Sequence, residues 1–211
     1  MPRKPTMVLF VRHGQTPTTG AVLPGRAPGL NLSDRGREQA EQAAARIAVL
    51  GPDRIEAVYA SPMERARQTA APIARAVGRR VRVLQGLNEC DFGRWTGRRL
   101  SDLRRRRDWQ QVQRTPSSFR FPGGESFAEM QIRITGAVQL LVDRHPGSTV
   151  VAVSHADPIK AAIAHASGTH LDLFQRIVVS PCSINAVLYH EDGPLVLAVN
   201  STTDLEALVP Q

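Results

Sequence analysis

The stretch MVLFVRHGQT, residues 7–16, runs from five apolar residues into an arginine, a histidine and a glycine. An apolar run that contains Val and Phe and ends at turn residues is typical of a buried strand in a mostly parallel sheet. In open α/β sheets, ligands bind in the crevice beyond the carboxyl ends of such strands. We therefore expect Arg12 and His13 to stand in that crevice, where their side chains suit an anion.

The size and composition of the chain predict one globular domain. Its 211 residues, 42% of them hydrophobic, fall in the usual range for a single domain. No stretch approaches the roughly 20 apolar residues of a membrane span, and the first apolar run is too short for a secretory signal. We predict an unexported, cytoplasmic protein without a membrane partner. Cys90 and Cys182 lack metal-site spacing and are predicted to be buried free thiols.

The charge of the chain favours anionic partners. Its formal net charge is +8 at pH 7, and Lys4 and Lys160 are the only lysines among its basic residues. Such a balance attracts anions electrostatically but does not identify one. The densest basic run, RRLSDLRRRRDW at residues 98–109, is interpreted as a solvated helix face. The alternative is an arginine rim that attracts acidic substrates.

Strand-like and helix-like segments alternate along the chain. After the first strand and a loop rich in Gly and Pro, strands are predicted at 56–62, 81–85 and 148–155, followed by a hairpin whose turn is Glu-Asp-Gly. Helices are predicted at 33–51, 62–77, about 101–113, from about 127, and 157–167. This order predicts an α/β fold, a three-layer sandwich with a mostly parallel central sheet, one antiparallel strand, and helices on both faces. Residues 1–211 are predicted to form one domain, with a lid or insertion at about 98–124.

Four segments carry the side chains that indicate a reaction. Arg12 and His13 follow the first strand, and Arg65 opens the helix after the second. Glu89 lies after the third strand and His155 ends the fourth, so parallel strands would bring all of them together. Arginine does not ligate metals and repels cations, but it binds phosphate through charge-assisted hydrogen bonds. A neutral imidazole is a nucleophile near pH 7, and a carboxyl group can donate a proton to a leaving oxygen and then take one from water. The set predicts a phosphate site.

Five blocks of sequence also carry a resemblance to a known family. They are, in order, VRHGQT (11–16), SPMERARQT (61–69), LNECDFGRWTG (87–97), FPGGES (121–126) and VSHADPIK (153–160). Over residues 7–200 the chain resembles the histidine phosphatase superfamily, and more narrowly its phosphoglycerate-mutase-like branch. The resemblance implies that His13 becomes phosphohistidine, that Arg12, Arg65 and His155 form the phosphate pocket, and that Glu89 is the general acid and base. It implies no metal and no cofactor.

Three further residues are predicted to bind substrate: Thr19, Arg26 and Ala156. The family commonly has Asn at the position of Thr19, and a threonine hydroxyl donates only one hydrogen bond. It usually has Gly at the position of Ala156, where the added methyl group narrows the pocket. Neither departure removes a catalytic role.

The protonation of the two central groups can also be anticipated. Cationic neighbours should lower the pKa of His13 and keep it neutral. Its other ring nitrogen is expected to donate to a backbone carbonyl, that of Gly14 or of a nearby residue. Asp91 lies two residues from Glu89 and is its competitor for the acid–base role.

Phosphatase and mutase activities share the phosphohistidine step. Mutases of this branch carry a long insertion after the acidic residue, whereas CDFGRWTG follows Glu89 directly. This resembles the phosphatase members. We therefore predict a metal-independent phosphomonoesterase that acts on a small phosphorylated metabolite, with a cofactor-dependent phosphoglycerate mutase as the alternative.

Two other classes of function are alternatives. A nucleic-acid-binding protein on an inactive phosphatase scaffold would need aromatic side chains for stacking, and the only tryptophans are Trp95 and Trp109, so nucleic acid is disfavoured as a partner. A metal hydrolase using His155 and Asp157 would lose activity with a chelator, and we expect no loss. If the chain self-associates, we expect a homodimer.

Overall fold

The computed structural model describes residues 4–201, which include a six-stranded sheet. The sheet order is β3-β2-β4-β1-β5-β6. The strands are β1 (Thr6–Arg12), β2 (Ile55–Ala60), β3 (Val81–Val83), β4 (Thr149–Ser154), β5 (Ile184–His190) and β6 (Gly193–Ser201). The first four run parallel, and β5 runs antiparallel to both of its neighbours. The predicted mostly parallel sheet with one antiparallel strand is confirmed.

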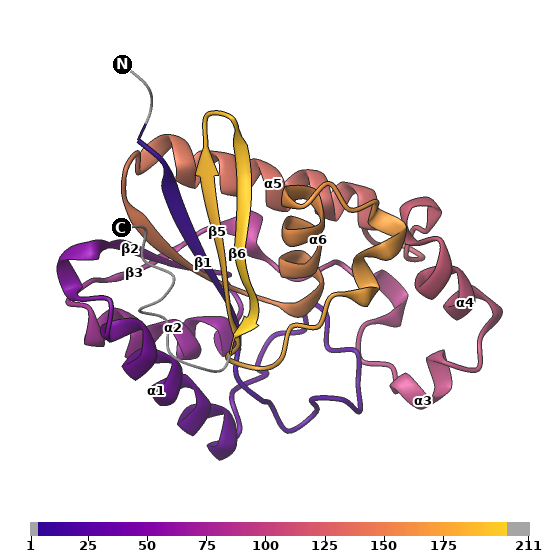
Figure 1. Ribbon diagram of the computed structural model, residues 1–211. Coiled ribbons are helices and arrows are strands. Elements are labelled where there is room, and N and C mark those ends of the chain that lie inside the picture. Colours follow the sequence, from indigo (N-terminus) through magenta and orange to yellow (C-terminus); the bar gives the residue numbers. More distant parts are fainter. Residues whose placement is uncertain (1–3, 202–211) are drawn as a thin grey trace.

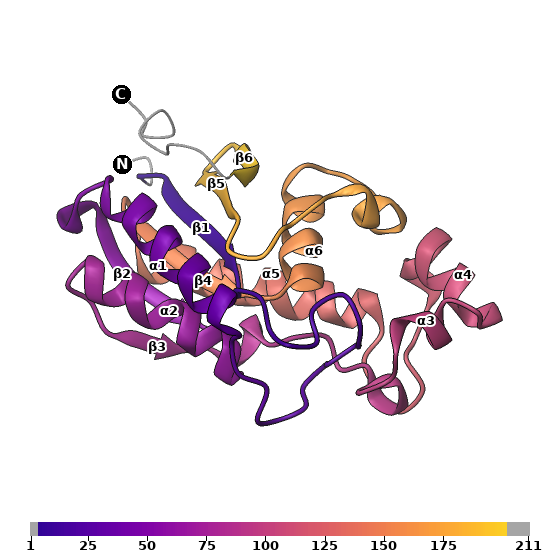
Figure 2. The same cartoon turned by 90° about the horizontal axis from the view of Figure 1, so that it is seen from below.

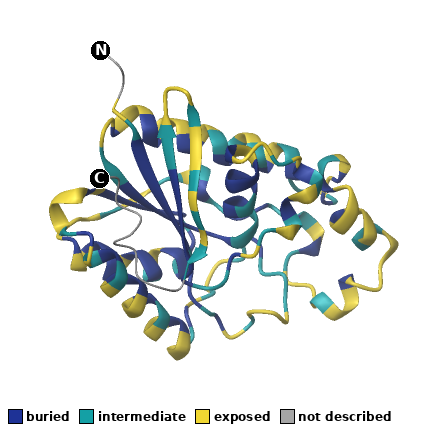
Figure 3. Cartoon of the chain, viewed as in Figure 1, coloured by how far each residue is buried: buried dark blue, intermediate teal, exposed yellow. Residues whose placement is uncertain are grey.

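Helices cover both faces of this sheet (Figures 1 and 2). The helices α1 (Asp34–Ala48) and α2 (Glu64–Ala76) lie on one face, and α5 (Phe127–Arg144) and α6 (Ala156–Ala166) lie on the other. The two larger hydrophobic cores lie on opposite faces, and β1 contributes to both: Val8 and Phe10 pack toward α5 and α6, while Leu9 and Val11 pack toward α1 and α2. Figure 3 shows the central strands buried between the two layers. A strand buried on both faces is apolar at every position, which explains the uninterrupted run at residues 7–11.

Helix starts are set by side-chain caps at two of the predicted boundaries. The Ser33 hydroxyl accepts a hydrogen bond from the Gly36 N–H at the start of α1. Ser126 and Glu129 form a reciprocal capping box at the start of α5. Each cap satisfies N–H groups that the helix itself leaves without a partner.

The basic helix predicted at about 101–113 is instead two short helices, α3 (Leu100–Leu103) and α4 (Arg107–Arg114). Leu103 and Val112 are both buried. They are nine positions apart, or about two and a half helical turns, so one straight helix would place them on opposite sides. The break between the helices lets both side chains reach the same core while most of the arginines stay exposed.

Two remaining expectations concern membranes and cysteines. Among residues 4–201, no helix combines the length and the apolar character that crossing a membrane requires. Cys90 and Cys182 are free and buried, as predicted. Burial raises the pKa of both thiols.

Candidate active site

The predicted residues meet at the carboxyl ends of the parallel strands. Arg12 is the last residue of β1, and the N–H of His13 donates to the Ser154 carbonyl at the end of β4. His155 follows directly and immediately precedes α6. The imidazole rings of His13 and His155 lie 5.1 Å apart between centroids. Segments about 140 residues apart in sequence therefore form one site because β1 and β4 are paired neighbours.

The hydrogen bonds of His13 define its reactive nitrogen. Its Nδ1 lies 2.7 Å from the Gly14 carbonyl oxygen, which can only accept, so Nδ1 carries the proton. Its Nε2 receives a hydrogen bond from Arg65 Nε at 3.3 Å, so Nε2 holds a lone pair. Burial first, and the charge of Arg65 second, lower the pKa of His13 to about 3. The imidazole is therefore neutral at physiological pH with Nε2 available for attack.

The two arginines of the site are partly unsatisfied. Arg65, in the first turn of α2, is fully buried and donates from Nη2 to the Gly25 carbonyl at 2.8 Å. Arg12 donates from Nη1 to the Val179 carbonyl at 2.7 Å. Among the described residues, Arg65 Nη1 and Arg12 Nε are buried without a hydrogen-bond partner. Buried donors without a hydrogen-bond partner are costly, and guanidinium donors in this state suit an anionic ligand.

Glu89 and His155 form the other half of the site. Glu89 Oε2 lies 3.7 Å from His155 Nδ1, and Glu89 Oε1 accepts from the Cys90 N–H at 2.9 Å. Burial, followed by the negative charge of Asp157, raises the pKa of Glu89 to about 7. Glu89 can therefore hold a proton near neutral pH, which a general acid requires.

Asp91 is placed differently from Glu89. Its Oδ1 accepts from the Gly93 N–H at 2.9 Å, within its own turn, and its side chain is 43% exposed. The geometry thus favours Glu89 over Asp91 for the acid–base role.

Arg26 contacts the loop that carries Glu89. Its Nε donates to the Glu89 carbonyl at 2.8 Å and its Nη2 to Glu125 at 3.0 Å. Arg133 of α5 donates to the carbonyls of Asn88 and Glu89 and to Glu125. These two arginines hold the loop in place, and a contact between Arg26 and substrate stays a prediction.

Thr19 and Ala156 occupy unlike positions. Thr19 is exposed, and its hydroxyl accepts from the Thr16 N–H at 2.8 Å. Ala156 begins the 11-residue α6, whose first turn receives no side-chain cap. An uncapped helix N-terminus presents N–H groups and a positive dipole to an anion. Substrate contacts from both residues stay predictions.

The sequence did not mark two serines that the structure places here. The Ser61 hydroxyl lies 2.7 Å from His155 Nε2 and so orients that ring. Ser183 is buried next to β1, its carbonyl accepts from the Arg12 N–H, and its hydroxyl has no partner within residues 4–201. Ser61 begins the block SPMERARQT, but nothing in that block gave it a role, and Ser183 lies in no such pattern.

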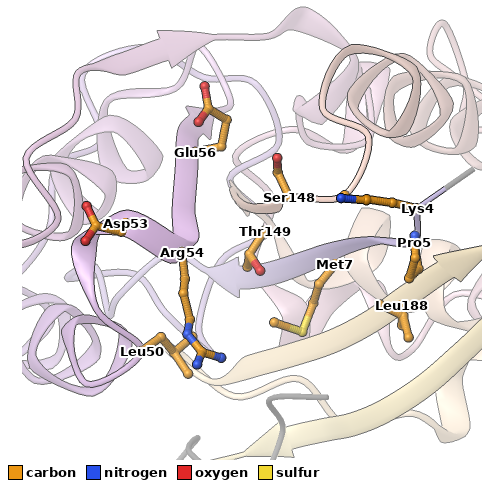
Figure 4. A pocket seen from close by; sticks show the side chains of 11 residues that line it. Lys4, Pro5, Met7, Leu50, Asp53, Arg54, Glu56, Ser148, Thr149 and Leu188 are labelled. Atoms are coloured by element: carbon orange, nitrogen blue, oxygen red, sulfur yellow. The ribbon is translucent and has the colours of Figure 1, made fainter. Parts of the chain in front are cut away.

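A cavity of about 460 Å³ lies at the opposite ends of the parallel strands from this site (Figure 4). Met7, Thr149 and Glu56 line it, and they lie at or near the amino ends of β1, β4 and β2. None of the predicted site residues does so. Ligands of α/β sheets bind at the carboxyl ends, so this cavity is not the candidate active site.

The side chains with metal-ligand spacing lie away from the candidate active site. In the described part of the chain, one trio of side chains has spacing that could hold an ion, His190, Glu191 and Asp192, exposed at the β5–β6 turn. His155 and Asp157 do not belong to it.

Comparison with known proteins adds independent observations. A family model described as histidine phosphatase superfamily (branch 1) matches residues 8–202. Phosphoserine phosphatase 1 of Hydrogenobacter thermophilus is 29% identical, over 94% of this chain and 93% of that protein. Probable phosphoglycerate mutase GpmB of Cronobacter sakazakii is 32% identical, over 87% of this chain and 85% of that protein. The solved structure of Bacillus stearothermophilus YhfR superposes with a TM-score of 0.86 at 24% identity, over 95% of this chain and all of that one.

Three further relatives, from Mycobacterium bovis and Mycobacterium tuberculosis, are 34% identical over 94% of this chain. The match covers 54% of their own length, so the chain spans about half of these relatives.

Proposed function

The chain belongs to the histidine phosphatase superfamily, in its phosphoglycerate-mutase-like part, and from this membership we propose that it is a metal-independent phosphomonoesterase that forms a phosphohistidine intermediate. The observation that carries the proposal is His13, a buried neutral imidazole whose Nε2 lone pair faces the guanidinium of Arg65. The proposed substrate is a small phosphorylated metabolite.

The proposed reaction has two steps. In the first, His13 Nε2 attacks phosphorus in line, the bond from phosphorus to the ester oxygen breaks, and the Glu89 carboxyl gives its proton to that oxygen. In the second, the Glu89 carboxylate takes a proton from water, the water oxygen attacks phosphorus, and the nitrogen–phosphorus bond breaks. The products are an alcohol, inorganic phosphate and the original enzyme.

The remaining site residues stabilise charge during both steps. Arg12, Arg65 and His155 are assigned to the phosphoryl oxygens, with their unpaired buried atoms as donors. Fixed donors of this kind act most strongly where water is excluded. The Ala156 N–H, Thr19 and Arg26 are proposed as additional substrate contacts.

A mutase is the second candidate because one relative of 32% identity has that name. The segment between Glu89 and Gly123 holds two short α-helices and two 3-10 turns, and it lacks the long insertion expected of mutases, which favours hydrolysis. Conversion of 3-phosphoglycerate to 2-phosphoglycerate that outpaces phosphate release would overturn the phosphatase assignment.

Three parts of the proposal concern the wider molecule. We propose that the chain works as one domain with residues 98–124 as a lid, in the cytoplasm and without nucleic acid as a partner.

The homodimer stays a prediction that light scattering on the purified chain tests. Tight RNA binding with a steep salt dependence and no turnover would favour the nucleic-acid alternative.

The decisive experiment measures turnover and the intermediate together. The wild type should hydrolyse p-nitrophenyl phosphate at the same rate with and without a chelator. Quenching with labelled substrate should trap an acid-labile phosphoryl group. His13→Ala should lose both activity and label, whereas His165→Ala, which removes an exposed histidine on α6, should keep both. Label on another residue, or activity that survives in His13→Ala, would refute the mechanism.

A further inference from the structure

A second cavity, of about 260 Å³, lies under the segment that contains α3 and α4. Its apolar wall includes Leu23, Phe92, Leu100, Trp109 and Phe121. Leu23, Leu100 and Trp109 are only partly buried, although they pack against the larger core. Partly exposed apolar side chains around one hollow are typical of a ligand pocket.

This cavity adjoins the candidate active site through the loop after β1. The Gly25 carbonyl accepts the hydrogen bond from Arg65 Nη2. A Cβ at Gly25 would lie 3.2 Å from the ring of Phe92, which forms part of the cavity wall. One loop residue therefore separates a phosphate-directed guanidinium from the apolar wall.

The first turn of α6 provides a second connection. Asp157 lines the cavity and lies two residues after His155. Its charge also acts on Glu89 and helps to raise the pKa of that carboxyl. Asp157 thus connects the cavity wall with the part of the site that holds His155 and Glu89.

Two of the four polar residues that line the cavity, Asp157 and Gln175, are linked by a lysine outside its wall. Lys160 Nζ donates to Gln175 Oε1 at 3.1 Å and lies 3.8 Å from Asp157 Oδ1. The other two, Arg104 and Gln113, are exposed, and the remaining seven lining residues are apolar. A carboxylate beside α6 would meet the negative charge of Asp157. An apolar body would cover Trp109 and Leu100 without disturbing these contacts.

We propose that this cavity receives the alcohol part of the substrate and that this alcohol carries an apolar body of the size of a ring system. The proposal rests on the proposed phosphatase function and deepens it. It assigns substrate selection to Trp109, the aromatic side chain that α4 contributes to the wall. Phosphorylated amino acids and glycerates are then poor substrates.

The test compares two esters that leave as primary alkoxides of similar basicity, 2-naphthylmethyl phosphate and ethyl phosphate. We expect kcat/KM for the naphthylmethyl ester to be at least about tenfold higher, the scale on which apolar pockets discriminate. Phosphoserine should resemble ethyl phosphate. Equal values for both alkyl esters, or a preference for phosphoserine, would overturn the proposal.

Variants locate the effect in the cavity. Trp109→Ala should lower the ratio of the two kcat/KM values by about fivefold or more, and Trp109→Phe should retain most of it. Arg105→Gln, in the same segment but outside the cavity wall, should leave the ratio unchanged. If Trp109→Ala fails to fold by circular dichroism, Leu100→Ala takes its place, and an unchanged ratio in the folded variant would refute the assignment.

These outcomes are separable from the failure of the proposed function. A wild type that hydrolyses p-nitrophenyl phosphate and forms phosphohistidine, but does not distinguish the two alkyl esters, loses only the substrate assignment. A wild type that hydrolyses no ester loses the proposed function itself.

Discussion

At the scale of single residues, His13 and Glu89 show how burial prepares two groups for opposite tasks. Removal from water disfavours the charged form of each, so the imidazole stays free of its second proton and the carboxyl keeps its proton. The proposed nucleophile and the proposed general acid are therefore both in the protonation state that they need at the same pH. Environments that push the pKa values of two neighbouring groups apart are a common arrangement for acid–base catalysis.

This pair predicts a pH profile with one enzyme-derived limb. For ethyl phosphate, kcat/KM should decline as pH rises through about 7, because Glu89 loses the proton that it donates. No limb from His13 should appear until pH falls to about 3. Glu89→Gln should lower kcat/KM by about 10²-fold or more and abolish the alkaline limb. Comparing the two enzymes on the same substrate at each pH cancels the effect of substrate ionisation. A limb that persists in Glu89→Gln would assign the proton to another group.

The sequence was informative about residues that follow strands and uninformative about those that support them. Strand ends and the family's blocks of sequence predicted His13, Arg65 and His155, which the structure places in one site. Ser61 and Arg133 act through contacts with segments distant in sequence, which no local pattern records.

At the scale of elements, the start of α1 is fixed to the loop that holds His13. A Cβ at Gly14 would lie 2.5 Å from the Gly36 carbonyl oxygen, and a Cβ at Gly36 would collide with the Gln15 carbonyl. Helix and loop therefore approach backbone to backbone, which only glycine permits at these positions.

Two glycine substitutions separate this contact from helix propensity. Gly36→Ala should destabilise the protein by about 1–3 kcal/mol because the methyl group overpacks the contact, and activity should fall as His13 shifts. Gly136→Ala, in α5 with open space around the position, should stabilise by about 0.5–1 kcal/mol. Urea denaturation measures both. Stabilisation by Gly36→Ala would contradict the close contact.

Elements with a buried stripe or a buried run were predictable, and the segment with α3 and α4 was not. Its arginine-rich composition is typical of a helix. The break between α3 and α4, however, depends on the core that Leu103 and Val112 reach. That core is assembled from α5, α6 and distant loops, so no local window contains the information.

At the scale of the whole molecule, the site makes stability depend on pH. Burial lowers the pKa of both His13 and His155. The unfolded chain therefore binds protons below pH 6.5 that the folded chain does not bind. The stability that comes from keeping these two histidines neutral is present above that pH and is lost on acidification. Glu89 acts in the opposite sense between pH 4.5 and about 7, but two histidines outweigh one carboxyl.

We expect the free energy of unfolding to fall as pH falls from 6.5 toward 4.5. His13→Gln should reduce the slope of that free energy against pH by about one proton, or about 1.4 kcal/mol per pH unit. Denaturation curves at several pH values provide the slope. An unchanged slope would show that His13 titrates normally in the folded protein.

The buried thiols have a practical consequence. Cys90 and Cys182 are shielded and remain protonated, and peroxide and alkylating reagents attack exposed thiolates. The proposed reaction uses an imidazole and not a thiol as its nucleophile, so it does not depend on a reactive cysteine. Iodoacetamide inactivates cysteine-dependent phosphatases in a crude extract but should leave this protein active. Its turnover could then be measured without their background.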